Sequence, residues 1–200
     1  YNALTSCTTN HNTAVGSKAL EDTTSGSGNV SVGSLCLMDN TTGGNNTGVG
    51  FSCLRYGTTG ANNSALGVGA LQNNTASDNT GIGSLALNAN TSGTRNTAVG
   101  KDALKANTTA TDNTAIGFRC LEAATTGANN TAIGRSPLIS NTTGEQNTVL
   151  GAFAGDVITT GDNNTCIGYD ADASSATVNN EITLGNSSVA TLRCNVQTIS

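Results

Sequence analysis

Residues 96–104 read NTAVGKDAL, residues 113–121 read NTAIGFRCL, and residues 130–138 read NTAIGRSPL. Related segments recur along the chain, each with a glycine that follows an aliphatic residue. Successive glycines lie 17 residues apart in nine intervals and 16 apart in one, between Gly67 and Gly83. Self-similarity at a fixed period is the sequence signature of a repeat architecture, so this repeat decides the fold.

Four positions of the repeat keep one chemical character. The glycine column is Gly16, Gly33, Gly50, Gly67, Gly83, Gly100, Gly117, Gly134, Gly151, Gly168 and Gly185. The residue before each glycine is aliphatic: Val15, Val32, Val49, Leu66, Ile82, Val99, Ile116, Ile133, Leu150, Ile167 and Leu184. The asparagine column, four residues before the glycine, is Asn12, Asn29, Asn46, Asn63, Asn79, Asn96, Asn113, Asn130, Asn147 and Asn164. The leucine column, four residues after the glycine, is Leu20, Leu37, Leu54, Leu71, Leu87, Leu104, Leu121 and Leu138.

Two aliphatic anchors per 17 residues are too few for a helical solenoid, whose repeats need roughly 33 to 47 residues. The apolar segments are short, β-branched and bounded by Gly, Asn, Asp and Ser, which is typical of strands and turns. The sequence therefore predicts an all-β fold: a parallel β-solenoid of about eleven 17-residue coils. We expect two short strands and two turns per coil, with coils stacked ~4.8 Å apart.

Each column then has an expected structural role. Both aliphatic columns are expected to form a narrow core. The small residues two positions before the glycine should let the walls approach closely, and the asparagines should form a ladder of stacked amides. The glycines should adopt positive φ or mark a tight corner. The repeat domain spans residues 1–178, and residues 179–200 have a different rhythm that predicts a terminal cap or neck.

Composition argues against several classes of function. Of the 200 residues, 10% are charged and 3% aromatic, and the net charge is -5. There is no basic cluster of the kind that binds nucleic acid, and no apolar run approaches the ~18 residues that span a bilayer. We find no catalytic constellation, metal site or cofactor motif, so the sequence predicts neither an enzyme nor a protein inserted in a membrane.

The cysteines and the remaining polar residues fit the repeat. Cys36, Cys53 and Cys120 stand three residues after the glycine, where other coils have alanine, and Cys166 stands in the small column. We interpret them as small buried residues; oxidation of the stacked pair Cys36 and Cys53 is the alternative. His11 is expected to be a solvated turn residue.

Two further polar patterns have a functional alternative. Asp162, Asp170 and Asp172 are expected to be solvated turn acids, although acids of this kind also occur in calcium sites. Threonine pairs recur in register, as in an ice-binding solenoid. Here the two threonines are adjacent and several pairs precede glycine, which favours turns.

The NTAIG coils resemble the head repeats of YadA-like trimeric autotransporter adhesins and similar repeats of bacteriophage tail fibres. The resemblance covers residues 1–178 and implies a left-handed β-roll that packs as a homotrimer. Residues 182–194, ITLGNSSVATLRC, resemble the segment that precedes the intramolecular chaperone of endosialidase-type phage fibres. That resemblance implies a fibre trimerised by a chaperone that then cuts itself off, which would put Ser200 near the mature C-terminus.

A thin core also favours oligomerisation, because little apolar area is buried per ordered residue. The leading hypothesis is a structural fibre or adhesion module of a virion, attaching to a host-surface glycan or protein receptor through multivalent contacts. The head of a bacterial trimeric adhesin at the cell surface is the alternative, and an ice-binding solenoid is a minor one.

Overall fold

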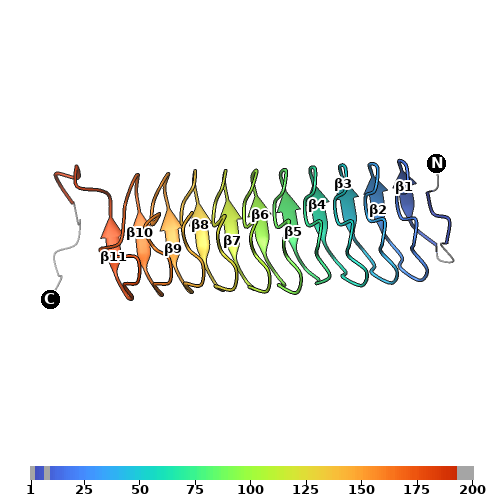
Figure 1. Cartoon of the computed structure of the whole chain (residues 1–200). Coiled ribbons are helices and arrows are strands. Elements are labelled where there is room, and N and C mark those ends of the chain that lie inside the picture. The colour runs from blue at the N-terminus through green and yellow to red at the C-terminus, as the bar shows by residue number, and fades with distance from the viewer. Residues whose placement is uncertain (1–2, 7–9, 193–200) are drawn as a thin grey trace.

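The computed structural model describes residues 3–6 and 10–192 and shows an all-β rod built from one parallel sheet (Figure 1). Its eleven strands pair in sequence order, with β1 and β11 at opposite ends of the rod. The strands are β1 (Thr13–Val15), β2 (Val30–Val32), β3 (Thr47–Val49), β4 (Ser64–Leu66), β5 (Thr80–Ile82), β6 (Thr97–Val99), β7 (Thr114–Ile116), β8 (Thr131–Ile133), β9 (Thr148–Leu150), β10 (Thr165–Ile167) and β11 (Ile182–Leu184).

The predicted parallel β-solenoid is confirmed. Strand residues pair with their equivalents one repeat later, as Thr97 does with Thr114. The strand β11 lies in the segment expected to be a cap or neck, and it continues the sheet by pairing with β10. Within residues 3–6 and 10–192 there is no helix long and apolar enough to cross a membrane.

The expectation of two strands per coil was wrong for the described coils, since each contributes one three-residue strand to the sheet. The rest of each coil consists of turns, yet these also bond along the rod axis. The Leu37 amide donates to the Cys53 carbonyl at 3.0 Å, and the Thr41 amide donates to the Thr58 carbonyl at 2.9 Å. Turn sequences therefore stack as strands do, although their dihedral angles are not those of strands.

The core contains the leucine column but not the aliphatic column before the glycine. All eight leucines are at most 2% exposed, whereas Val15 is 58% and Leu66 50% exposed. Our prediction that both columns form the core was therefore wrong for the aliphatic column before the glycine. Each strand alternates outward, inward and outward, so the inward position is the small residue in its middle.

The narrow interior explains this orientation. A Cβ added to Gly81, in the small column, would lie 3.1 Å from Leu71 Cγ. The space between the strand and the leucine column thus holds a residue no larger than alanine in most coils. A larger aliphatic side chain fits inside only beside an interruption of the leucine column, as Val149 does beside Gly155.

The leucines reach the core through an uncommon backbone conformation. Leu104 has φ 49°, and each of the other seven lies between 49° and 53°. The left-handed conformation costs about 1–2 kcal/mol for a residue with a Cβ. Complete burial of a leucine side chain contributes about 1.5–3 kcal/mol, which is enough to offset that cost.

The repeated glycine is required by both conformation and space. Gly117 has φ +134°, and a Cβ at this position would overlap the carbonyl oxygen of Gly134 in the next coil. The coils could not stack at this corner with any other residue. By contrast, the position of Gly44 is occupied by Ala61, Ser77 and Thr94 in later coils.

We therefore expect Gly117→Ala to destabilise the solenoid by about 2–4 kcal/mol, through backbone strain and a steric overlap. Gly44→Ala is the matched control: its Cβ would lie 3.0 Å from the Ser27 carbonyl oxygen without positive φ, and its free energy of unfolding should fall by no more than about 1 kcal/mol. Urea unfolding followed by circular dichroism measures both. Equal stability of the two variants would contradict this account of the corner.

Candidate functional site

The asparagine column forms a continuous, buried ladder along the rod. Asn113 shows the pattern: its side-chain oxygen accepts the backbone amide of Asn130 at 2.8 Å, and its side-chain nitrogen donates to the Gly127 carbonyl at 2.9 Å. Asn29 through Asn164 are all at most 1% exposed. Each side chain therefore joins its own coil to the next one and spans the interior to the opposite wall.

A second buried asparagine ladder stands seven residues after the glycine, and sequence reasoning missed it. Its members are Asn40, Asn74, Asn90, Asn107 and Asn141. The signal was present as a recurring asparagine before threonine, but Gly57, Ala124 and Ile158 interrupt the column.

The two ladders converge on one column of carbonyl oxygens. The Gly93 carbonyl accepts from Asn79 at 2.8 Å and from Asn90 at 2.9 Å. The Ala110 carbonyl accepts in the same way from Asn96 and Asn107. Both lone pairs of these carbonyls are used inside the rod, which fixes the wall that carries the threonine turns.

The interruptions leave specific polar atoms without a partner. Asn107 Oδ1 is buried and accepts no hydrogen bond, and the next member of its column is Ala124. Asn40 Oδ1 is likewise unpaired, and the next member of its column is Gly57. Where the column is unbroken, Asn107 Nδ2 donates to Asn90 Oδ1 at 2.7 Å.

Ala124→Asn should complete the interrupted ladder and raise stability by about 1 kcal/mol, because Asn107 Oδ1 and the Gly127 carbonyl each gain a donor. The same substitution at Gly57 is the control. A Cβ there would overlap the Asn74 carbonyl oxygen, so Gly57→Asn should destabilise the solenoid. Chemical unfolding of both variants measures the difference, and a destabilised Ala124→Asn would contradict the ladder argument.

A third ladder runs along the threonine turns. In most coils the threonine eight residues after the glycine donates its hydroxyl to a carbonyl one coil later, as Thr108 does to Thr125 and Thr142 does to Thr159, each at 3.1 Å. These hydroxyls are used within the rod. The threonine pairs lie in turns, as expected.

An aliphatic stripe covers the outer face of the sheet. We define this strand-face stripe as the residue before each repeated glycine, from Val15 to Leu184. Most of its members are exposed. Exposed Phe51, Val68, Phe118 and Tyr169, each directly after a repeated glycine, extend the apolar surface around the corner.

The opposite edge of the rod is polar. We define the polar edge as the exposed residues five positions before the glycine: Asn45, Asn62, Asp78, Arg95, Asp112, Asn129, Gln146 and Asn163. Arg95 donates to Asp112 in the next coil through Nε at 2.7 Å and a terminal nitrogen at 2.8 Å. The Asp112 pKa is lowered, first by that hydrogen bond.

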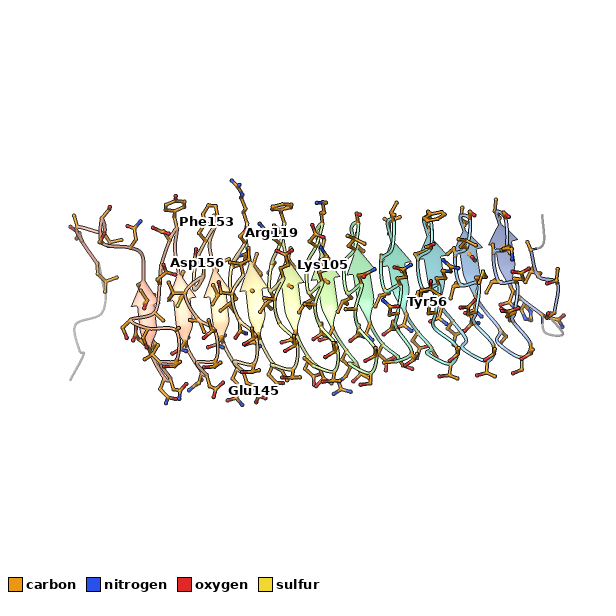
Figure 2. All side chains as sticks on the ribbon, in the orientation of Figure 1. Tyr56, Lys105, Arg119, Glu145, Phe153 and Asp156 are labelled. Carbon is orange, nitrogen blue, oxygen red and sulfur yellow. The ribbon has the colours of Figure 1, made fainter. Side chains whose placement is uncertain are left out.

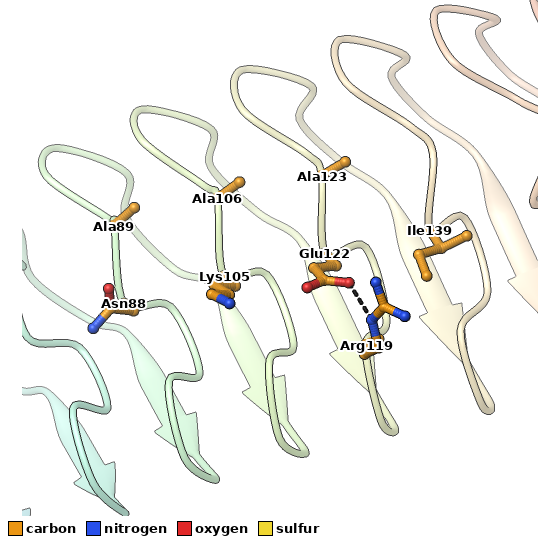
Figure 3. A pocket seen from close by; sticks show the side chains of 8 residues that line it. All are labelled: Asn88, Ala89, Lys105, Ala106, Arg119, Glu122, Ala123 and Ile139. Atoms are coloured by element: carbon orange, nitrogen blue, oxygen red, sulfur yellow. Dashed lines mark hydrogen bonds and ion pairs between the residues drawn. The ribbon is translucent and has the colours of Figure 1, made fainter.

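A shallow groove of about 570 Å³ lies on the face that follows the leucine column (Figure 3). Alanines at positions 89, 106 and 123 repeat along it, with Lys105 and the ion pair between Arg119 and Glu122 beside them. Its full lining is Asn88, Ala89, Lys105, Ala106, Arg119, Glu122, Ala123 and Ile139. The groove is open and combines an alanine row with charges of both signs.

The other residues named from the sequence do not converge on a site. His11 is exposed, and Asp162, Asp170 and Asp172 form no cluster that could hold a metal ion within residues 3–6 and 10–192. Cys36, Cys53, Cys120 and Cys166 are buried. Cys7, Cys194 and Ser200 lie outside the described residues.

Acidic side chains near the C-terminal end of the rod raise one another's pKa values. Asp172 Oδ1 accepts the backbone amide of Asp156 at 3.1 Å. Partial burial is the main cause that raises the pKa of both carboxyls, and neighbouring carboxylates, including Asp170, raise them further. Such acids oppose folding while they are charged, and this opposition is relieved as pH falls through their raised folded-state pKa values.

Asp156→Asn should therefore raise the midpoint of thermal unfolding at pH 7, because it removes a partly buried charge from among other carboxylates. The difference between the variant and the parent should shrink as pH falls toward the ordinary Asp pKa of about 3.9, where the parent carboxyl takes up a proton. A difference that stays constant or grows on acidification would contradict this assignment.

Comparisons of the chain with protein-family models, curated proteins and solved structures found no match. The functional argument therefore depends on the surfaces of the rod.

Proposed function

We propose that this chain is a structural fibre and adhesion segment of a virion, in which three copies pack along their strand-face stripes and turn their polar edges outward. The observation that carries the proposal is the stripe itself. It is apolar, straight and continuous from β1 to β11 on a rod with a thin core. Attachment to a host-surface glycan or protein would follow from many weak contacts presented together.

A second copy of the same chain is the occupant that best fits the stripe. The stripe presents one aliphatic side chain per coil. Only a partner with the same axial spacing can pack against these side chains along the whole stripe. Ten intervals at ~4.8 Å make the stripe about 50 Å long. Apolar surface of this extent is uncommon on a monomer and marks an interaction site.

Three copies fit the shape of the stripe, which is one side chain wide and is bordered by the outward threonines of the strands. A narrow ridge can meet two others at a central axis, where each chain contacts both neighbours. The resemblance to trimeric adhesin heads and phage fibres supports the same number. In this arrangement the aliphatic column becomes the shared core of the trimer.

The polar edge supports the adhesive part of the proposal. Figure 2 places Glu145 on the edge of the rod away from Phe153. Along this edge, amides, carboxylates and a guanidinium repeat from coil to coil, and these are the groups that bind sugar hydroxyls or polar peptide surfaces by hydrogen bonds. The polar edge stays accessible when three stripes face inward.

Native mass spectrometry tests the assembly, and the parent chain should form trimers. The double substitution Ile116→Asp and Ile133→Asp places charges on the stripe in adjacent coils and should give folded monomers with unchanged circular dichroism. Asn129→Asp and Gln146→Glu add the same charge to the polar edge and should leave the trimer intact. A parent chain that is monomeric at micromolar concentration would contradict the proposal.

Immunogold labelling of virions and of bacterial cells tests the location. Label on virion appendages is the expected result. Label on the bacterial surface alone would instead favour the head of a trimeric adhesin, which would use the same stripe and the same polar edge.

A further inference from the structure

Two cysteines are stacked directly above one another inside the rod. Cys36 and Cys53 occupy the same position in adjacent coils, three residues after the glycine, where Ala19 and Ala70 stand in the flanking coils. Their sulfur atoms are 2.8 Å apart, and both residues are 0% exposed. This separation is shorter than the van der Waals contact of two non-bonded sulfur atoms.

The strand wall leaves room for this sulfur pair. A Cβ added to Gly48, in the middle of β3, would lie 2.6 Å from Cys36 Sγ and 3.1 Å from Cys53 Sγ. Five of the other ten strands have alanine at this position, and one other strand, β5, has glycine. The two cysteines and the glycine that faces them thus form one local exception to the repeat.

We propose that Cys36 and Cys53 form a disulfide bond that joins adjacent coils near the N-terminal end of the rod. Equivalent atoms in stacked coils lie ~4.8 Å apart. Disulfide-bonded residues have Cα atoms about 4.4–6.8 Å apart, and the coil spacing lies within that range. The bond would close one complete turn of the solenoid.

The other described cysteines lack this arrangement. Cys120 occupies the same column, but its neighbours there are Ala103 and Pro137, and its sulfur donates to the Ala132 carbonyl at 3.1 Å. Burial raises the Cys120 pKa to about 12, which keeps it a thiol. Cys166 stands in the small column, between Val149 and Thr183.

Formation of the bond needs an oxidant, which we take to be a low-molecular-weight disulfide. One cysteine thiolate attacks a sulfur of that disulfide, forms a mixed disulfide and releases one thiolate. The second cysteine thiolate then attacks the protein sulfur and releases the other thiolate, and the two protons lost by the cysteines convert the two released thiolates to thiols. Because both sulfurs are fully buried in the closed coils, the exchange takes place before these coils close.

The spacing of cleavage sites makes the bond directly measurable. Trypsin releases residues 19–55, which contain Cys36, Cys53 and no other cysteine. The single methionine, Met38, lies between the two cysteines, so cyanogen bromide divides this peptide into residues 19–38 and 39–55. The two fragments stay joined only if the disulfide is present.

The experiment refolds the reduced, full chain with oxidised and reduced glutathione, then alkylates it in denaturant without further reduction. We expect the peptide 19–55 to be two hydrogen atoms lighter and free of alkyl groups in most molecules. Its cyanogen bromide fragments should separate only after reduction. Before denaturation, added reductant should leave the bond intact, since the sulfurs are buried.

Two controls accompany this measurement. The Cys120 peptide, residues 120–135, should be alkylated throughout. Cys53→Ala places the residue most common in this column and should give a folded chain whose peptide 19–55 is alkylated once, at Cys36. If both cysteines of the refolded parent chain are alkylated, or if either is bonded to a different cysteine, the proposal is overturned.

Discussion

The buried asparagine ladder is the interaction on which the rest of the rod depends. A buried amide is costly unless both its oxygen and its nitrogen are hydrogen-bonded. Asn113 meets that requirement only because Asn130 and Gly127 occupy fixed places one coil later. The ladder thereby fixes the register. At the single short interval, the Asn79 amide still donates to Asn63 Oδ1 at 2.9 Å, and the missing residue is absorbed in the threonine turn.

The narrow interior that these amides span determines which side chains face inward. Beside a leucine it admits only a small residue of the strand, so the larger aliphatic residue before the glycine lies outside. Val149 lies inside because Gly155 takes the place of the leucine in that coil. This explains why a chain with an ordered core also exposes a continuous apolar stripe. The same narrow interior limits the stability of a single rod, because little apolar area is buried per ordered residue.

The repeat period, the parallel stacking and the role expected for the asparagines follow from sequence, since identical columns at a fixed spacing have few ways to pack. The orientation of Ile116 does not follow, because an aliphatic residue beside glycine suits either face of a three-residue strand. The φ of 49° at Leu104 was equally unforeseen, since left-handed conformation is rare for leucine and only the packed coil stabilises it. The second ladder, with Asn90 and Asn107, was hidden by its interruptions.

Stacking requires the interior columns to repeat, whereas the exterior columns can vary from coil to coil. Differences in binding chemistry along the rod can therefore arise only on its exterior. Under the proposed adhesive function, a rigid rod contacts its receptor along one edge or at one end, because it cannot wrap around it. Along the polar edge, Arg95 and Asp112 pair with each other while Asn129 and Gln146 remain exposed, so neighbouring coils present different chemistry at one spacing. Weak contacts at such spacing add up only on a partner that is itself extended or repeated. A dense cell-surface polymer meets that condition better than a single small ligand.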